Sequence, residues 1–375
     1  MNSRIVKILS IALLSAFLTG CMGDSSQDNQ NNSAEDYEEK SVDDFSKAKA
    51  DYDYAKDEFN QGNYLNAAKG VFNAAVNFVA SKVDEILGYM SKSSGSYKID
   101  TNRLVHNKNL RNVALTFASK SKTIATDYYD GEKPIPLGQM VLKYSSIVGP
   151  SGKGSIRQRL VATIQFHEAN NSKDAQLSIL CNNDSRHSVD FGIGQVNTVS
   201  WSGNGTCKGM VDEDIIATAT KKCMDYYTHP QNYIDPTTGK KVNINVYIQR
   251  LLENKYGGKT NLVRNPRSPF NPITNTACSY RHLNADFQTA YSLFRTCSSL
   301  ESVSGGKFRC SGSPDPDFDY AAVALIAYGG ITKGIISSGI RLQNRNTGEI
   351  IQTIDDYLAE FRAAYAALYK EPPPF

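Results

Sequence analysis

The chain has 375 residues, and its 41 Lys and Arg against 38 Asp and Glu give a formal net charge of only +3 at pH 7. Nucleic-acid-binding proteins need clustered basic surface, so this nearly balanced charge gives no reason to expect nucleic acid as a partner. The length is sufficient for two domains of ordinary size. The seven cysteines include no Cys-x-x-Cys pair of the kind found in zinc or redox sites, and we expect no metal and no cofactor.

The N-terminus has the features of a secretory signal. Two basic residues precede an apolar run over residues 8–18, which is too short to span a bilayer. The run ends in Leu18-Thr19-Gly20-Cys21, which resembles the lipoprotein box of bacteria. The resemblance implies that residues 1–20 are removed and Cys21 is acylated, and Met22 then favours the outer membrane, facing the periplasm. The alternative is an ordinary signal followed by an unrelated cysteine.

The remaining cysteines all lie in the second half of the chain: Cys181, Cys207, Cys223, Cys278, Cys297 and Cys310. An even number in an oxidising compartment is typical of disulfides. We therefore expect three disulfides, and the spacing leaves their pairing open.

The region before residue 151 is predicted to contain a tether and a helical segment. Residues 21–40 are expected to be a disordered tether, because they are rich in Asp, Glu, Asn, Gln and Ser. Within the helical region 41–150, apolar stripes at helical spacing run from Phe45 to Phe59 and from Leu65 to Ile86, on either side of a turn at Gly62. This pattern predicts a helical hairpin. A single tetratricopeptide-like repeat is the alternative, but a solenoid needs several copies.

The region 151–375 is predicted to be a second, mostly helical domain with a small β-hairpin, which makes the chain α+β. Periodicity predicts one alternating strand over residues 188–196 and a disulfide-pinned insertion over 228–319. Helices are expected at 156–168, 212–227, 243–255, 283–297, 320–328 and 353–369, after an earlier one at 109–121.

Glu168 is the first candidate catalytic residue. It ends the helix predicted at 156–168, on the same face as Val161 and Ile164. A carboxyl group at the end of an apolar stripe is partly desolvated, and desolvation favours its protonated form, which a general acid needs. The alternative is a rim Glu that turns toward water. His167 lies about 100° away around the helix and is expected to pack, and His187 is expected to be solvated.

The second candidate segment is 188–197, Ser-Val-Asp-Phe-Gly-Ile-Gly-Gln-Val-Asn. Strict alternation places Asp190 on the face opposite the apolar residues. A glycine in such a strand, as at Gly192, often marks close approach by a neighbour or a ligand. Gln195 and Asn197 add amide groups suited to sugar hydroxyls.

Glu168 followed by Ser188-x-Asp190-x-Gly192-x-x-Gln195-x-Asn197 resembles the lysozyme-like superfamily, in the form found in animal-type lysozymes and in specialised lytic transglycosylases of secretion and conjugation systems. Trp201 follows where many relatives carry an aromatic residue. Ala327-Tyr328-Gly329-Gly330 looks like the Ala-Tyr-Asn-Gly segment of lytic transglycosylases. The resemblance covers roughly residues 155–340.

Two departures from the family pattern stand out. Relatives usually carry Ser after the catalytic Glu, where this chain has Ala169, so one supporting hydrogen bond is in doubt. The late segment lacks its Asn, which puts one sugar contact in doubt.

The resemblance implies a muramidase that cleaves the bond between N-acetylmuramic acid and N-acetylglucosamine. Glu168 would be the general acid and Asp190 the second carboxylate. The substrate contacts would come from Gly192, Gln195, Asn197, Trp201 and Tyr328. The partners implied are peptidoglycan glycan strands, the membrane through the N-terminal lipid, and a secretion or conjugation assembly. Ring closure to an anhydro end, as in lytic transglycosylases, is slightly favoured over hydrolysis as in lysozymes. A lipoprotein that binds glycan without cutting it is the non-enzymatic alternative.

Overall fold

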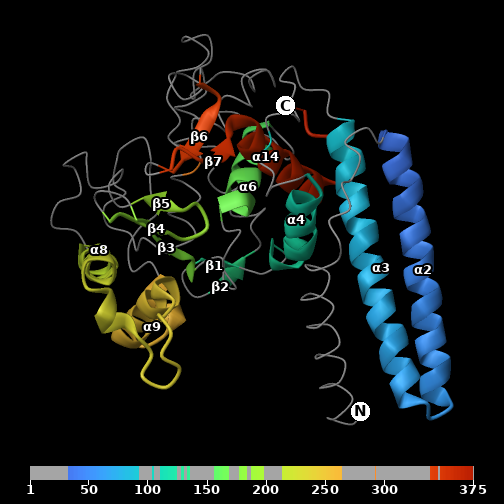
Figure 1. Ribbon diagram of the computed structural model, residues 1–375, viewed down its shortest axis with the longest axis horizontal. Helices are drawn as coiled ribbons and strands as arrows, with labels where there is room; N and C mark the ends of the chain where they lie inside the picture. Colours follow the sequence, from blue (N-terminus) through green and yellow to red (C-terminus); the bar gives the residue numbers. More distant parts are fainter. Residues whose placement is uncertain are drawn as a thin grey trace. The chain divides into compact units, whose positions relative to one another are not determined.

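The fold is mostly helical, with an N-terminal helical hairpin and small antiparallel sheets, which confirms the predicted α+β class (Figure 1). The computed structural model describes residues 33–92, 104, 110–124, 128–130, 133–135, 156–168, 177–183, 187–197, 213–263, 292, 338–344 and 347–374. The predicted signal, Cys21 and, apart from Ser292, the helices expected at 283–297 and 320–328 lie outside these ranges. None of the described helices is long and apolar enough to cross a membrane.

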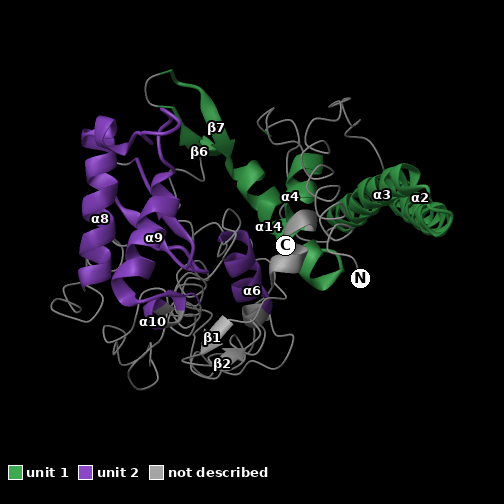
Figure 2. Ribbon diagram, turned by 90° about the horizontal axis from the view of Figure 1, so that it is seen from below, with its two compact units in different colours: residues 1–121, 333–375 green, residues 122–332 purple. Residues whose placement is uncertain are grey.

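The chain divides into two compact units (Figure 2). The first contains residues 1–121 and 333–375, and the second contains residues 122–332. The C-terminal helix α14 (Ile354–Tyr369) therefore belongs to the first unit, together with the helices of the N-terminal hairpin. The boundary between the units does not coincide with the domain boundary predicted at residue 150.

The hairpin consists of α2 (Ala34–Asn60) and α3 (Tyr64–Ser91), which lie side by side in both views (Figures 1 and 2). The predicted helices are confirmed. The turn between them requires Gly62, whose φ of +81° lies in the left-handed region that favours glycine.

The predicted tether is too long, because residues 34–40 form the first turns of α2. Ser33 and Asp36 make a capping box, in which each side chain accepts a hydrogen bond from the other residue's backbone N–H. Tyr37 is buried beside Gly88 of α3. Capping and one aromatic anchor thus order a segment whose composition alone is typical of disorder.

Small and polar residues form the seam between α2 and α3. The buried small residues are Ala48, Ala55, Ala67, Gly70 and Ala74. Side-chain hydrogen bonds cross the seam, among them those from Ser41 Oγ to the Ser81 carbonyl (3.0 Å) and from Asn77 Nδ2 to Asp51 Oδ2 (2.8 Å). The predicted apolar stripe of α2 is therefore mostly not in the seam: Phe45, Tyr52 and Phe59 are 50%, 60% and 41% exposed.

The apolar stripe predicted for α3 is buried in the second half of this helix. Val83, Ile86 and Met90 are buried, and α14 packs against α3. Asp84, also fully buried, accepts a hydrogen bond at 2.8 Å from Arg111 of α4 (Leu110–Ile124). Burial raises the pKa of Asp84, and the positive charges of Arg111 and Lys40 oppose this shift.

Helix α14 also packs against two strands that precede it in the chain. Strands β6 (Ile340–Gln343) and β7 (Ile350–Thr353) form an antiparallel pair that leads directly into the helix. Thr353 caps α14 in a second capping box with Asp356. Almost every residue of α14 is buried.

The second unit contains β1 (Tyr128–Asp130), β2 (Lys133–Ile135), α6 (Ile156–Glu168), β3 (Ile179–Cys181), β4 (Val189–Phe191), β5 (Val196–Asn197), α8 (Glu213–Thr228), the 3-10 helix η5 (Pro230–Tyr233), α9 (Ile244–Tyr256) and α10 (Lys259–Val263). The inner face of the sheet β3-β4-β5 packs on α8 and α9. Ile244, Ile248, Leu252 and Leu262 share this core. Residues 230–263, which open the predicted insertion, are thus part of the core of the unit.

The prediction of one strand over 188–196 is wrong. Strand β4 ends at Phe191, residues 192–195 form a turn, and β5 returns antiparallel to β4. Gly192 and Gln195 have φ of +72° and +46°. Alternation of apolar residues continues through the turn because Ile193 is buried within it, and the sequence pattern therefore hid the reversal.

The close seam of the hairpin predicts opposite effects for two glycines of α3. A Cβ on Gly70 would lie 2.8 Å from Ala55 Cβ and 3.0 Å from the Asp51 carbonyl oxygen, so Gly70→Ala should lower the free energy of unfolding by about 1–3 kcal/mol. A Cβ on Gly88 would meet only ordinary contacts, the nearest at 3.6 Å, so Gly88→Ala should raise it by about 0.5–1 kcal/mol. Denaturant unfolding followed by circular dichroism measures both, and equal effects would contradict the described seam.

Candidate active site

Asp190 lies in the middle strand of the three-stranded sheet. It pairs with Leu180 of β3 on one side and with Asn197 of β5 on the other. Its neighbours Val189 and Phe191 are fully buried, whereas Asp190 is partly exposed. This confirms that Asp190 is on the face opposite the apolar residues. Leu180 is 40% exposed on that same outer face.

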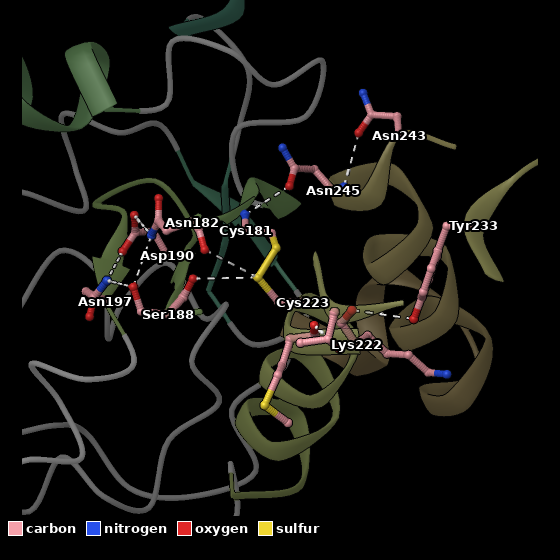
Figure 3. Close-up of a disulfide and its surroundings, with 12 residues drawn as sticks. Cys181, Asn182, Ser188, Asp190, Asn197, Lys222, Cys223, Tyr233, Asn243 and Asn245 are labelled. Atoms are coloured by element: carbon pink, nitrogen blue, oxygen red, sulfur yellow. Dashed lines mark hydrogen bonds between the residues drawn. A yellow bond between two sulfur atoms is a disulfide. The ribbon is translucent and has the colours of Figure 1, made fainter. Parts of the chain in front are cut away.

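Two asparagine amides hold the Asp190 carboxylate from both sides (Figure 3). Asn182 Nδ2 donates to Oδ2 at 2.8 Å, and Asn197 Nδ2 donates to Oδ1 at 2.6 Å. Both amides also donate to Ser188 Oγ, at 3.3 Å and 3.0 Å. Hydrogen bonds to a carboxylate favour its charged form. We call this group the amide clamp; it holds the Asp190 carboxyl group in place on the outer face of the sheet.

Asn182 is the member of the clamp that sequence reasoning missed. It follows the last residue of β3, and its backbone N–H donates to the Ser188 carbonyl at 2.9 Å, which sets the two residues opposite each other. In the sequence it stands in a polar run before the recognised motif. Only the pairing of β3 with β4, which periodicity did not predict, brings it to Asp190.

Gln195 and Gly192 have roles within the turn. Gln195 Nε2 donates to Ser178 Oγ at 3.0 Å and to the Gly192 carbonyl at 2.7 Å. Gly192 N–H donates to the Ser178 carbonyl at 2.7 Å. The neighbour that approaches Gly192 is therefore the chain itself, and the Gln195 amide nitrogen is already used to hold the turn. Their contact with a substrate stays a prediction.

Glu168 is the last residue of α6, as predicted. Residues 163–167 before it are all buried, and the Glu168 side chain is 20% exposed. His167 is buried, in agreement with the expectation that it packs, and its Nδ1 lies 3.3 Å from Glu168 Oε1. Glu168 is thus a half-buried carboxyl group at the end of a buried helix, with an imidazole beside it.

The prediction that His187 is solvated is wrong. Its ring stacks on Tyr227 of α8, with centroids 5.5 Å apart and the planes 15° from parallel. Its Nδ1 is buried, and its φ of +47° is in the left-handed region. A non-glycine residue rarely adopts this conformation, and here it directs the chain into Ser188 of the amide clamp.

The Cys181–Cys223 disulfide fastens the sheet to α8 (Figure 3). It joins the end of β3 to the middle of α8, with Cα atoms 5.6 Å apart. Asn245, in the first turn of α9, accepts a hydrogen bond from the Cys181 N–H at 2.9 Å. One of the three expected disulfides is therefore present. The other four cysteines, Cys207, Cys278, Cys297 and Cys310, lie outside the described residues.

A second set of contacts, made by side chains, holds the segment after α8 in place. Tyr233 Oη donates to Asp225 Oδ2 at 2.8 Å, and His229 Nδ1 lies 3.1 Å from the other oxygen. The hydrogen bond from Tyr233 lowers the pKa of Asp225, and burial together with that carboxylate raises the pKa of Tyr233. The chain is thereby turned back so that α9 packs behind β3.

Two predicted substrate contacts, Trp201 and Tyr328, lie outside the described residues. No protein family, no curated protein sequence and no solved structure shows significant similarity to this chain. The function is therefore argued from the geometry around Asp190 and Glu168.

The amide clamp predicts that a second carboxylate at position 182 is costly. Asn182→Asp replaces a donor to Asp190 by a like charge, and at about pH 7 it should lower the free energy of unfolding by about 1–3 kcal/mol. Repulsion raises both pKa values in the folded state, so the loss should disappear as pH falls below about 3 to 4, where both groups are protonated.

Asn183→Asp is the matched control, because Asn183 is exposed and next in sequence. It should be nearly neutral at both pH values. Equal stability of the two variants at neutral pH would contradict the hydrogen bond from Asn182 to Asp190.

Proposed function

We propose that the protein is a peptidoglycan muramidase that cleaves the bond between N-acetylmuramic acid and N-acetylglucosamine, with the anhydro end of a lytic transglycosylase as its main product. The observation that carries the proposal is the amide clamp, which holds Asp190 charged and partly exposed on the outer face of a small sheet. A fixed negative charge of this kind stabilises a positively charged, oxocarbenium-like centre. The sequence resemblance around Glu168 and Asp190 supports the same reaction.

Glu168 has the role of general acid. The role is supported by the sequence resemblance and by its place, partly buried at the end of α6, where its carboxyl group is within reach of a bound glycosidic oxygen only from the exposed side. Its proton goes to the glycosidic oxygen as the bond to the anomeric carbon breaks. His167 Nδ1, 3.3 Å from Oε1, helps to orient the carboxyl group.

The clamp favours ring closure over a covalent enzyme intermediate. Both oxygens of Asp190 accept hydrogen bonds, which lowers the nucleophilicity of the carboxylate while keeping its charge in place. The primary hydroxyl of the muramic acid residue then attacks the anomeric carbon, and Glu168, now ionised, accepts the hydroxyl proton. One bond from oxygen to the anomeric carbon breaks and another forms, and no water is consumed.

In this proposal the lipid expected on Cys21 holds the enzyme at the outer membrane, facing the cell wall. The proposed activity would open the cell wall locally, as a secretion or conjugation machine needs. A hydrolytic lysozyme, or a lipoprotein of such a machine that binds glycan without cutting it, are the alternatives that the following experiments separate.

Glu168→Gln keeps the shape of the side chain but removes the acidic proton. Release of soluble fragments from purified peptidoglycan should fall by about 10²- to 10⁴-fold, the range typical of general acid catalysis. Binding to intact sacculi should be retained. Glu253→Gln on α9 is a matched control and should release fragments at the normal rate. Near-normal release by Glu168→Gln would remove the assignment of the active site.

Asp190→Asn tests the fixed charge, because the amide keeps the size of the side chain and loses the negative charge. The rate should fall by about ten-fold or more, as expected when electrostatic stabilisation of a transition state is lost. Mass spectrometry of wild-type products should find fragments one water lighter than hydrolysis products. Reducing ends throughout would identify a lysozyme instead, and an unchanged rate in Asp190→Asn would mean that Glu168 acts alone.

A further inference from the structure

The hairpin has an exposed face that its own packing uses only in part. Small residues bring α2 and α3 together, and the larger apolar residues of α2 therefore lie outside the seam. Phe45, Lys49, Tyr52, Lys56 and Phe59 are all exposed. They are spaced four, three, four and three residues apart, so they share one face of the helix. We call this face the aromatic–lysine stripe.

Aromatic residues of α3 extend the stripe sideways. Phe78 packs beside Phe45, with ring centroids 6.4 Å apart, and Tyr64 meets Phe59 edge to face at 5.6 Å. Both α3 residues are themselves more than 40% exposed. Each end of the stripe is therefore a pair of rings held in place by mutual contact, which is the preorganised surface that a flat ligand requires.

The stripe alternates an aromatic ring with an ammonium group. Lys49 and Lys56 are exposed, and within the described part of the chain neither takes part in an ion pair. The pattern repeats every seven residues, which is about 10 Å along a helix. A ligand that fits must present apolar faces and negative charges in alternation, at a similar period.

We propose that the aromatic–lysine stripe is a second binding site for peptidoglycan glycan strands. The disaccharide of such a strand advances by a comparable length, and one sugar in two carries a lactyl group whose carboxylate, or that of its attached peptide, is negatively charged. Sugar rings stack on Phe45, Tyr52 and Phe59, and the carboxylates pair with Lys49 and Lys56. The identity of the glycan rests on the proposed function.

The charges on α2 argue against other occupants. A second helix, including a second copy of this chain, would have to bury Lys49 and Lys56 in the middle of its contact, which is unfavourable at such positions in a helix pair. The rest of α2 is rich in exposed acidic residues, such as Glu39, Asp43 and Asp53, which are repelled by a membrane surface of anionic lipid. The same acidic residues would repel an anionic polymer that covered the whole helix, so the proposal requires a single narrow strand that follows the stripe.

Binding of the mature chain to purified sacculi, measured by sedimentation in the non-cutting Glu168→Gln background, tests the proposal. Lys49→Glu with Lys56→Glu keeps the aromatic packing and should weaken binding by about five-fold or more, because two attractive contacts become repulsive. Phe45→Ala, Tyr52→Ala and Phe59→Ala together should do the same. The matched control combines Tyr54→Ala with Lys69→Glu, which removes one exposed ring and reverses one exposed charge outside the stripe.

Binding by both stripe variants equal to that of the control would overturn the proposal. A second outcome would also overturn it. Light scattering would show that the wild type is a dimer, and the two lysine reversals would convert it to monomers without weakening its binding to sacculi. Cleavage of short soluble glycan fragments by the stripe variants with Glu168 intact is read separately and should be normal. Absence of cleavage in every variant would sink the proposed muramidase, while weaker sacculus binding by the stripe variants would still support the second site.

Discussion

The arrangement of the candidate site depends on one short antiparallel pairing, that of β3 with β4. This pairing brings Asn182 opposite Ser188 and so completes the amide clamp on Asp190. Strands of three residues are too short to be stable alone. The pairing persists because the disulfide at Cys181 and the hydrogen bond from its N–H to Asn245 fix β3 to α8 and α9. The chemistry on the outer face of the sheet is thus supported by the packing on its inner face.

The two carboxyl groups of the proposed mechanism lie in different environments. Glu168 ends a helix whose preceding residues are buried, and its side chain lies beside His167. Asp190 accepts two amide hydrogen bonds on the outer face of the sheet. The proposed reaction requires that one carboxyl group donates a proton while the other stays ionised. The proposal therefore needs both environments. The environment of Asp190 depends on more of the fold, because residues in or next to β3, β4 and β5 together form the amide clamp.

Local patterns in the sequence predicted most of the elements but not how they pack. The helix ending at Glu168 and the outward face of Asp190 followed from apolar spacing, because burial on one side is recorded in the residues themselves. The same spacing put Phe45, Tyr52 and Phe59 on one apolar stripe of the hairpin, but the structure has small residues in the seam and leaves these three exposed. Periodicity identifies an apolar face but does not identify its partner. Asn182 was missed for a related reason, since a polar residue gains its role only from the strand opposite.

The exposed stripe on α2 follows from the way the hairpin is built. Gly70 and Ala55 bring the helix backbones so close that a larger side chain does not fit between them. An aromatic residue can then lie only beside the seam or outside it, and Phe45 and Phe59 contact aromatic residues of α3 there while keeping much of their surface in water. Exposed apolar residues that gather on one face can mark an interaction site. In the proposed second site, the lysines between the rings favour a partner that brings negative charge to the stripe, as a glycan strand with acidic substituents would.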